Sequence, residues 1–494
     1  MNELTITLNV KSTVPLYEQI YEYIKTDIRN GKIKCKEKLP STRALAKYLE
    51  VSRSTVELAY EQLLAEGYVE AEACRGFFVA QIDALYQWEP EKEKRRKKEE
   101  KKKKVYRYDF SPWGIDLQSF PQGVWRRLTK EILGDDRPEL FQSGDPQGEY
   151  ELRETIRRYL YQSRGVNCEP EQIIVGAGND YLLILLGIIL GKEHKIAFEN
   201  PTYRQAHRLF SNLSYDTCVV EMDQKGIRVD ELEQSGADIA YVMPSHQYPL
   251  GIVMPIQRRL ELLRWAAIKK DRYIIEDDYD SEFRYKGKPI PALQGYDRNE
   301  KVIYIGTFSR SVAPSIRISY LVLPKSLLSV YHERCRFISS TVSRVDQLII
   351  QKFIEKGHYE RHLNKMRALY KGRHDTMINS LKPLLPYCRI SGENAGVHLL
   401  LTFPEKIKEE LLIQKAEEKG VKVYGISDSD IRSQEKRKAV ILLGYANMSE
   451  EEIQKAVEIL LEAWKGLCKN SDEINEPERL LENNADIDCN QRRK

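Results

Sequence analysis

The chain has 494 residues, of which 41% are hydrophobic and 31% charged, and its formal net charge is +4. This length excludes a single hydrophobic core and predicts two or three domains of a soluble globular protein. So small a net charge identifies no partner, so only the distribution of charge along the chain is informative.

The eight cysteines are scattered and none forms a Cys-x-x-Cys pair. This pattern favours reduced thiols in a cytoplasmic protein over a disulfide framework or a zinc site. No basic segment followed by an apolar run opens the chain, so we expect no secretion signal. The longest apolar run, residues 181–190, is shorter than the roughly 20 residues of a membrane span, so we expect a buried helix and no membrane partner.

Composition divides the chain into four segments. We expect a compact N-terminal domain over residues 11–80 and a charged linker over 81–104, because residues 89–104 hold ten basic, five acidic and no apolar side chains. Alternating helix and strand patterns over 105–468 predict an α/β domain. Residues 469–494 are polar and predict a frayed tail.

The N-terminal segment shows helical spacing followed by two short strands. A first helix starts at Leu16 and ends at Gly31, and Ser41 is a good N-cap for a second one. A turn at residues 50–51 separates it from a third helix, which Gly67 ends. The apolar side chains expected to continue that third helix are Leu58, Ala59, Leu63 and Leu64. Residues 68–70 and 76–79 then predict a hairpin.

This order of elements is that of a winged helix-turn-helix. Its third helix would enter the major groove of DNA with its N-terminus first, which presents Ser52, Arg53, Ser54 and Thr55 to bases and phosphates. At the tip of the hairpin, Arg75 would reach a phosphate or the minor groove.

Charge within this segment agrees with DNA contact. Residues 1–80 are neutral overall, with eleven basic and eleven acidic side chains, yet residues 29–53 hold eight basic against two acidic ones. Such a basic stretch is what phosphate contact requires. The alternative is a helical adaptor whose lysines are merely solvated.

In the large domain, three predicted strands each lead into a polar turn. Residues 173–175 lead into Gly176-Ala177-Gly178-Asn179, a glycine-rich turn that suits a phosphate. Residues 273–275 lead into the acidic run 276–280, which is either a magnesium site or a solvated loop. Residues 302–305 lead into 306–311, whose hydroxyls, with Arg310 and Arg317, would suit a phosphate.

One family explains both halves of the chain. LPSTRALAKYL, VSRSTVELAYEQLLAEGYVE and RGFFV resemble the GntR-type winged helix. SGDPQGEYELRETIRRYL, RGVNCEPEQIIVGAG, ENPTYRQAHRLF, PSHQYPLG, YIIEDDYDSEFRY and GTFSRSVAPSIRISYLVLP resemble fold-type I aminotransferases. The chain therefore resembles MocR-type regulators, and especially the branch that senses γ-aminobutyrate. The resemblance implies a large domain with a mostly parallel sheet and flanking helices, and a smaller C-terminal α+β subdomain.

The resemblance also assigns roles. Arg43, Arg53 and Thr55 are the expected DNA contacts. For pyridoxal 5'-phosphate, Asp277 would pair with the ring nitrogen, Tyr279 would bond the ring hydroxyl and Tyr203 would stack on the ring. The residues implied to hold the phosphate are Gly178, Asn179, Ser309 and Arg317.

Three positions depart from the family pattern. Arg310 occupies the place of the lysine that forms the Schiff base, so we expect no catalytic residue and at most noncovalent binding of pyridoxal phosphate, with Arg310 bonding its phosphate or a carboxylate. Arg310 paired with Asp277 in an empty pocket is the competing idea. Gln205 and Asp428 stand where the γ-aminobutyrate-sensing branch has two carboxylate-binding arginines; Arg204 or Arg208 would substitute.

Three functions follow. The first is a homodimeric regulator that binds duplex DNA and senses an amino-acid-like effector. The second is a working pyridoxal-phosphate-dependent aminotransferase with an accessory DNA-binding domain, and the third a structural dimeric regulator with an empty pocket. His358 and His362 lack the H-E-x-x-H order of a zinc protease, so we expect no metal.

Overall fold

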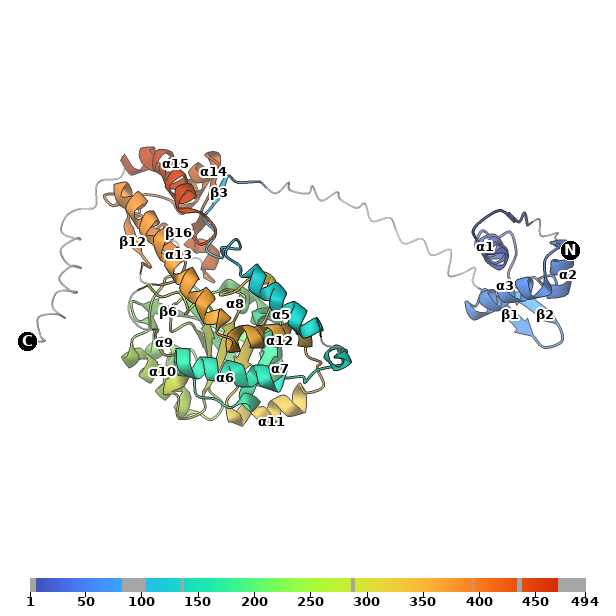
Figure 1. Ribbon diagram of the computed structural model, residues 1–494, viewed down its shortest axis with the longest axis horizontal. Helices are drawn as coiled ribbons and strands as arrows, with labels where there is room; N and C mark the ends of the chain where they lie inside the picture. Colours follow the sequence, from blue (N-terminus) through green and yellow to red (C-terminus); the bar gives the residue numbers. More distant parts are fainter. Residues whose placement is uncertain are drawn as a thin grey trace, which may run out of the picture. The chain divides into compact units, whose positions relative to one another are not determined.

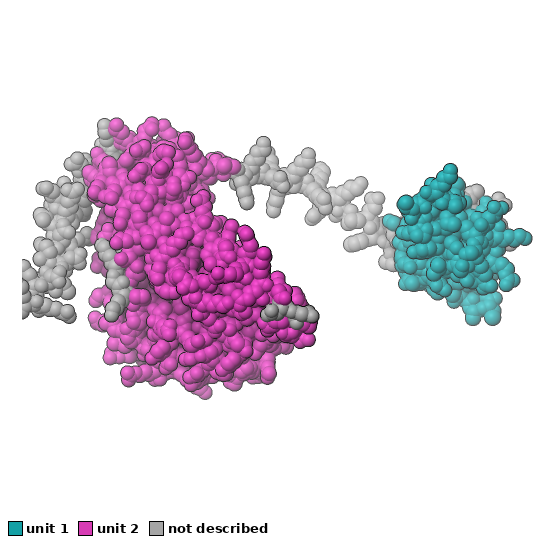
Figure 2. All heavy atoms as spheres, in the orientation of Figure 1, with its two compact units in different colours: residues 1–103 teal, residues 104–494 magenta. Residues whose placement is uncertain are grey.

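The computed structural model describes residues 6–81, 104–134, 137–285, 289–393, 395–432 and 438–469. The chain divides into two compact units, residues 1–103 and 104–494 (Figures 1 and 2). Almost all of the predicted linker and of the predicted tail lies outside the described residues. In the described parts of the chain, none of the helices combines the length and apolarity that a membrane span needs.

The first unit has the predicted order of helices and strands. Its elements are α1 Leu16–Arg29, α2 Thr42–Tyr48, α3 Arg53–Ala65, β1 Val69–Glu72 and β2 Gly76–Val79. The side chain of Ser41 accepts the N–H of Ala44, and that of Ser52 accepts the N–H of Thr55, each at 3.1 Å. These two N-caps satisfy amides that have no partner inside the helix, which fixes where α2 and α3 begin.

The core of the first unit lies between α1 and α3. Ile20 and Ile24 from α1 pack with Val56, Ala59 and Leu63 from α3, and all five are buried.

Leu58 and Leu64, two of the apolar side chains expected to continue this helix, do not join its core face, because they are 51% and 40% exposed. With 3.6 residues per turn, the face that buries Val56 and Ala59 also includes Tyr60, whose hydroxyl donates to the Pro40 carbonyl at 2.9 Å. Leu58 then lies on the opposite side of the helix.

The second unit is built on an eight-stranded sheet in the order β4-β11-β10-β9-β8-β5-β6-β7. Its strands are β4 Ile173–Gly176, β5 Lys195–Asn200, β6 Asp216–Asp223, β7 Gly226–Ile227, β8 Ile239–Val242, β9 Tyr273–Asp278, β10 Val302–Thr307 and β11 Ser319–Val322. The five strands β6, β5, β8, β9 and β10 run parallel, and β11 is antiparallel to both its neighbours.

Helices cover both faces of this sheet (Figure 1). They are α5 Gln122–Gly134, α6 Tyr150–Arg164, α7 Asn179–Leu190, α8 Arg204–Asn212, α9 Val229–Gln234, α10 Ile256–Ile268, α11 Lys325–Arg334 and α12 Arg344–Glu355. Alternate residues of a strand point to opposite faces, and β10 shows this: Ile303 and Ile305 join a core with α7, whereas Tyr304 joins a core with α6 and α12.

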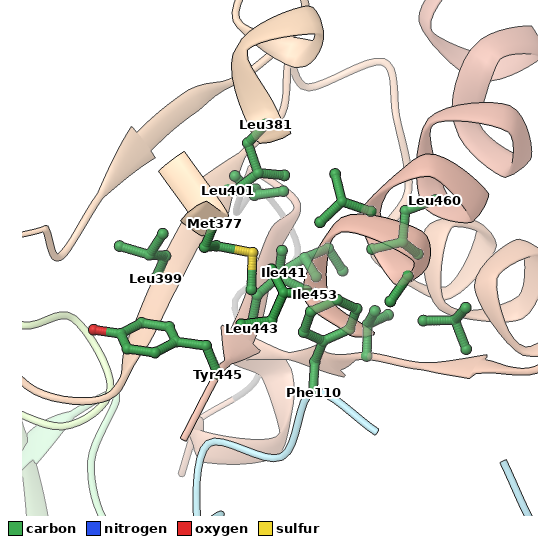
Figure 3. Packing of buried hydrophobic residues seen from close by; sticks show 14 of the residues in the cluster. Phe110, Met377, Leu381, Leu399, Leu401, Ile441, Leu443, Tyr445, Ile453 and Leu460 are labelled. Atoms are coloured by element: carbon green, nitrogen blue, oxygen red, sulfur yellow. The ribbon is translucent and has the colours of Figure 1, made fainter. Parts of the chain in front are cut away.

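A smaller antiparallel sheet, in the order β12-β13-β16-β15, forms the C-terminal part. Its elements are α13 His358–Leu381, β12 Arg389–Ser391, β13 His398–Thr402, α14 Glu409–Glu418, β14 Val421–Lys422, β15 Tyr424–Gly425, β16 Val440–Gly444 and α15 Glu450–Lys469. Figure 3 shows its core, in which Met377, Leu399 and Ile453 come from different elements.

The first residues of the second unit belong to this C-terminal core. The strand β3 Tyr108–Asp109 pairs with β14, and Phe110 is wholly buried in the cluster of Figure 3. The Phe110 carbonyl also accepts the N–H of Gly444 at 2.9 Å. The chain around Phe110 is therefore fixed in place immediately before it reaches the region of the ligand pocket.

Candidate DNA interface and candidate ligand pocket

The N-terminus of α3 carries a group of linked hydroxyls. Ser52 Oγ lies 2.8 Å from Ser54 Oγ and 2.7 Å from Thr55 Oγ1. Ser52 and Ser54 are exposed, and Thr55 is half-buried. A helix N-terminus with exposed hydroxyls and a positive dipole end suits a phosphate or a base edge.

Arg53, the first residue of α3, is 58% exposed and held by an ion pair within the helix. Its Nε donates to Glu57 Oε1 at 2.6 Å, one turn further along. This bond leaves both terminal nitrogens of the guanidinium for another partner, and such a pair can bind a guanine edge in a bidentate manner. Sequence reasoning missed Glu57 as the residue that orients Arg53.

The other two predicted DNA contacts are also exposed. Arg43 is the second residue of α2, which contacts α3. Arg75 is 70% exposed at the hairpin tip, where it pairs with Glu72 and lies over the ring of Phe78 at 5.5 Å. The structure therefore places Arg43 beside the helix that carries Arg53, and Arg75 on the wing.

All eight residues predicted for cofactor binding line one cavity of about 180 Å³ in the second unit. They are Gly178, Asn179, Tyr203, Asp277, Tyr279, Ser309, Arg310 and Arg317. Three strand ends, those of β4, β9 and β10, contribute to it, as expected for a ligand site at the carboxyl ends of parallel strands. Trp113, Met243 and Tyr248 also line the cavity and were missed.

One end of the cavity suits a phosphate group. The backbone of Gly178 has φ +91° at the N-terminus of α7, and a Cβ there would lie 2.4 Å from Arg317 Nη2. Arg317 itself donates to the Ala177 carbonyl at 3.1 Å and to Asp180 at 3.3 Å. Two buried polar atoms of the described pocket, Ser309 Oγ and Asn179 Oδ1, have no hydrogen-bond partner. These features fit an anion bound by backbone amides, hydroxyl and guanidinium.

Asp277 is a buried carboxylate on the pocket wall. It accepts the hydroxyl of Tyr241 and lies 3.5 Å from Asn179 Nδ2. Burial raises the pKa of Asp277 to about 6, although the Tyr241 hydrogen bond opposes that rise. Tyr241 comes from β8 beside β9, and nothing in its apolar sequence context indicated this contact.

The other acids of the run 276–280 each have protein partners. Glu276 accepts the backbone N–H groups of Leu293 and Gln294, at 2.7 and 2.9 Å. Asp278 accepts hydrogen bonds from Arg164 Nε at 2.8 Å and from the Tyr304 hydroxyl at 2.6 Å. The expectation of a solvated loop is wrong, because β9 extends through Asp278 and its acids are buried. Within the described residues, no three metal-ligating side chains gather.

Tyr279 connects the pocket to a buried polar network. Its hydroxyl lies 3.0 Å from Nδ1 of His246, which also lies 3.0 Å from both carboxylate oxygens of Asp280. Nearby, His398 contacts the ring of His246, and burial lowers the pKa of His398 to about 4. The hydroxyl of Tyr279 is therefore oriented by His246, which Asp280 contacts in turn.

Arg310 does not pair with Asp277. Its Nη2 donates to the Pro112 carbonyl at 3.2 Å, and its guanidinium lies 5.7 Å from the centre of the Trp113 ring. Asp277 instead bonds Tyr241 and Asn179, so the idea of an Arg310–Asp277 pair is wrong.

The missed Trp113 forms an aromatic wall of the cavity. Its ring centroid lies 4.4 Å from that of Tyr248 and 5.7 Å from that of Tyr203, and 41% of the residue is exposed. No periodicity or motif in the sequence connects residue 113 to the strand ends.

Gln205 and Asp428, the two other positions expected to depart from the family pattern, each have a defined place in the structure. Gln205 accepts the hydroxyl of Tyr203 at 2.6 Å, and Asp428 is exposed in a short turn. Neither Arg204 nor Arg208 is among the residues that line the cavity. In α13, His358 contacts two arginines and His362 contacts the Ser311 carbonyl, so the two histidines have separate partners.

Comparison with known proteins agrees with both units. Residues 16–79 match the model of the bacterial regulatory proteins of the gntR family, and residues 118–460 match that of aminotransferase class I and II. A GntR helix-turn-helix fused to a fold-type I aminotransferase domain defines the MocR-type transcriptional regulators, and the chain belongs to this family.

Its relatives extend over nearly the whole length. The chain is 40% identical over 470 residues to the uncharacterized HTH-type transcriptional regulator YhdI of Bacillus subtilis (strain 168), covering 95% of this chain and 100% of that one. It is 31% identical to the probable rhizopine catabolism regulatory protein MocR of Rhizobium meliloti, covering 94% and 96%. The multiple substrate aminotransferase from Thermococcus profundus superposes with a TM-score of 0.66 at 26% identity, covering 75% and 94%.

Proposed function

We propose that this protein regulates transcription by binding a duplex operator through its N-terminal domain, residues 11–80. The observation that carries the proposal is the exposed N-terminus of α3, where Arg53 and three hydroxyls stand at the start of a fully formed winged helix. Arg43 and Arg75 extend this surface onto α2 and the wing.

Selection of bound duplexes from a random pool, followed by fluorescence anisotropy on the recovered sequence, tests this proposal. An Arg43→Ala, Arg53→Ala double variant should lose at least tenfold in affinity, since one bidentate base contact is worth about 1–3 kcal/mol. A Lys269→Ala, Lys270→Ala variant loses the same charge from exposed positions of the second unit and serves as the control. Unchanged operator affinity in the arginine variant would contradict the assignment.

We further propose that residues 105–468 form an aminotransferase-like domain without transaminase activity, because Arg310 replaces the Schiff-base lysine. A Schiff base needs a neutral amine as nucleophile, and an arginine side chain stays protonated and is delocalised. The alternative function, a working aminotransferase, is favoured by the complete set of other residues around the cavity.

Reduction with borohydride in the presence of pyridoxal phosphate separates these two functions. The natural protein should give no covalent adduct at the pocket and no amino-group transfer. The Arg310→Lys variant should give an adduct, provided that the other residues of the pocket still hold the cofactor. An adduct on a pocket lysine of the natural protein would establish the alternative.

For noncovalent pyridoxal phosphate, each pocket residue has a proposed role. Gly178, Asn179, Ser309 and Arg317 would hold the phosphate, and Ser309 is favoured by its unpartnered buried hydroxyl. When bound, the cofactor supplies a protonated ring that withdraws electrons.

Asp277 would pair with the ring nitrogen, Tyr279 would bond the ring hydroxyl and Tyr203 would stack on the ring. The guanidinium of Arg310 would donate hydrogen bonds to a phosphate or carboxylate oxygen. Titration of the purified protein with pyridoxal phosphate separates this state from an empty pocket.

We also propose a homodimer held by the second unit, with an amino-acid-like effector in the pocket; a place near the γ-aminobutyrate-sensing branch stays a prediction. Large apolar side chains on the surface of this unit support the dimer: Phe337 is 83% exposed, Phe141 78%, and Ile184 and Ile188 on one face of α7 are each 42% exposed. A monomer at micromolar concentration by light scattering would contradict it.

A further inference from the structure

One side chain of α3, that of Leu58, is apolar although it lies on the exposed face of the helix. Leu58 is 51% exposed, and it is absent from the core cluster of the first unit and from the partly buried side chains packed against it. The helix buries Val56 and Ala59 on its other side.

The neighbours of Leu58 are the proposed DNA-contacting groups. Ser54 precedes it by four residues, which places the two side chains about 40° apart around the helix and about 6 Å apart along it. Glu57 is engaged by Arg53 at 2.6 Å, so its charge is neutralised locally. Leu58 is thus an apolar side chain in the middle of a surface whose charge and hydroxyls are complementary to DNA.

Among the base edges of the major groove, the C5 methyl group of thymine is the apolar feature that a leucine can cover. Ser54 lies in the first turn of α3 and Leu58 in the next, so a helix that enters the groove N-terminus first brings Leu58 to the base edges after Ser54. We propose that Leu58 is a specificity-determining residue that packs against the methyl group of a thymine in each half of the operator. This inference rests on the proposed DNA-binding function.

Replacement of thymine by uracil removes only the methyl group from the operator, so it isolates the proposed contact. Covering one methyl group contributes about 0.8 kcal/mol, which corresponds to about fourfold in affinity. We expect one thymine position in each half-site at which uracil weakens binding of the natural protein about fourfold. Leu58→Ala should weaken binding to the thymine operator and show almost no further loss with uracil.

Leu64→Ala is a matched control. Leu64 is 40% exposed on the same helix, but it lies in the last turn and about 120° around the axis from Leu58. Its substitution should leave both the affinity and the fourfold uracil effect unchanged. Circular dichroism on both variants verifies that the exposed substitutions leave the helices folded.

The measurement is fluorescence anisotropy with the full-length protein and a set of operators that carry single uracils. A uracil effect that vanishes only in Leu58→Ala supports the inference. Equal uracil effects in the natural protein and in Leu58→Ala, or no position sensitive to the methyl group, would overturn it. A changed mass by light scattering in Leu58→Ala with an intact uracil effect would assign Leu58 to a protein contact and also overturn it. If no duplex is selected from the pool, the proposed function itself fails, and the inference with it.

Discussion

Removal of the Tyr241 hydroxyl should make Asp277 harder to ionise. A hydrogen bond to a charged group contributes about 1.5–3 kcal/mol, and one pKa unit corresponds to 1.36 kcal/mol. The Tyr241→Phe substitution should therefore raise the pKa of Asp277 from about 6 to about 7–8. At pH 7 at least about half of Asp277 in the variant would be neutral, and the neutral form cannot form an ion pair with a protonated ring nitrogen.

The sign of the effect on stability follows from linkage. Because folding raises the pKa of Asp277 above its usual 3.8, this residue favours the fold fully at pH below about 4, and the contribution is lost as the pH rises through about 6. In Tyr241→Phe the contribution is lost up to about pH 7–8. The free energy of unfolding of the variant should therefore fall below that of the natural protein by about 1.5–2.5 kcal/mol more at pH 8 than at pH 5.

Urea unfolding followed by tryptophan fluorescence measures this difference, because four of the five tryptophans, Trp113, Trp125, Trp265 and Trp464, belong to the described second unit. Tyr215→Phe is the control, since the Tyr215 hydroxyl is also buried but donates to a neutral acceptor, the Gly187 carbonyl. A destabilisation by Tyr241→Phe that is the same at pH 5 and pH 8 would refute the reasoning.

Four further substitutions test other parts of the structure. Gly178→Ala should weaken pyridoxal phosphate binding at least tenfold in an equilibrium titration, because its Cβ would meet Arg317 at 2.4 Å and its φ is +91°; unchanged affinity would remove the phosphate role from this turn. Trp113→Phe should abolish most of the fluorescence change on ligand addition, since among the described tryptophans only Trp113 lines the cavity; a change of equal size would place the ligand elsewhere. Gly466→Ala in α15 should stabilise the second unit by up to about 1 kcal/mol in urea, because a Cβ there meets no atom within 4 Å. Gly165→Ala should destabilise it by about 1–2 kcal/mol, because this C-cap has φ +68°; effects of the same sign would contradict both.

Local patterns predicted much of the fold. The N-cap Ser41 and the stop at Gly67 predicted bounds of the helices of the first unit, because capping and glycine act within a few residues. The strand before Gly176 and the helix after it were also visible, since buried parallel strands are continuous apolar runs. Resemblance to a family then pointed to eight residues, all of which line one cavity.

Contacts between distant segments were not visible in the sequence. Trp113 reaches the pocket because β3 and Phe110 bind the C-terminal subdomain, and no local spacing encodes that pairing. Tyr241 is bonded to Asp277 through the neighbouring strand, 36 residues away. The exposure of Leu58 was also not predicted, because the angle of each residue around the helix decides which face it joins and an apolar residue is not always a core residue.

The contacts of Arg310 give this residue a structural part besides its place in the cavity. Its guanidinium holds the Pro112 carbonyl and lies over Trp113, so it fastens the segment that leads back to the charged stretch and the N-terminal unit. A lysine has no planar group to stack on the indole and presents a single point of attachment. The Arg310→Lys substitution would therefore loosen this segment at the same time as it changes the chemistry of the pocket.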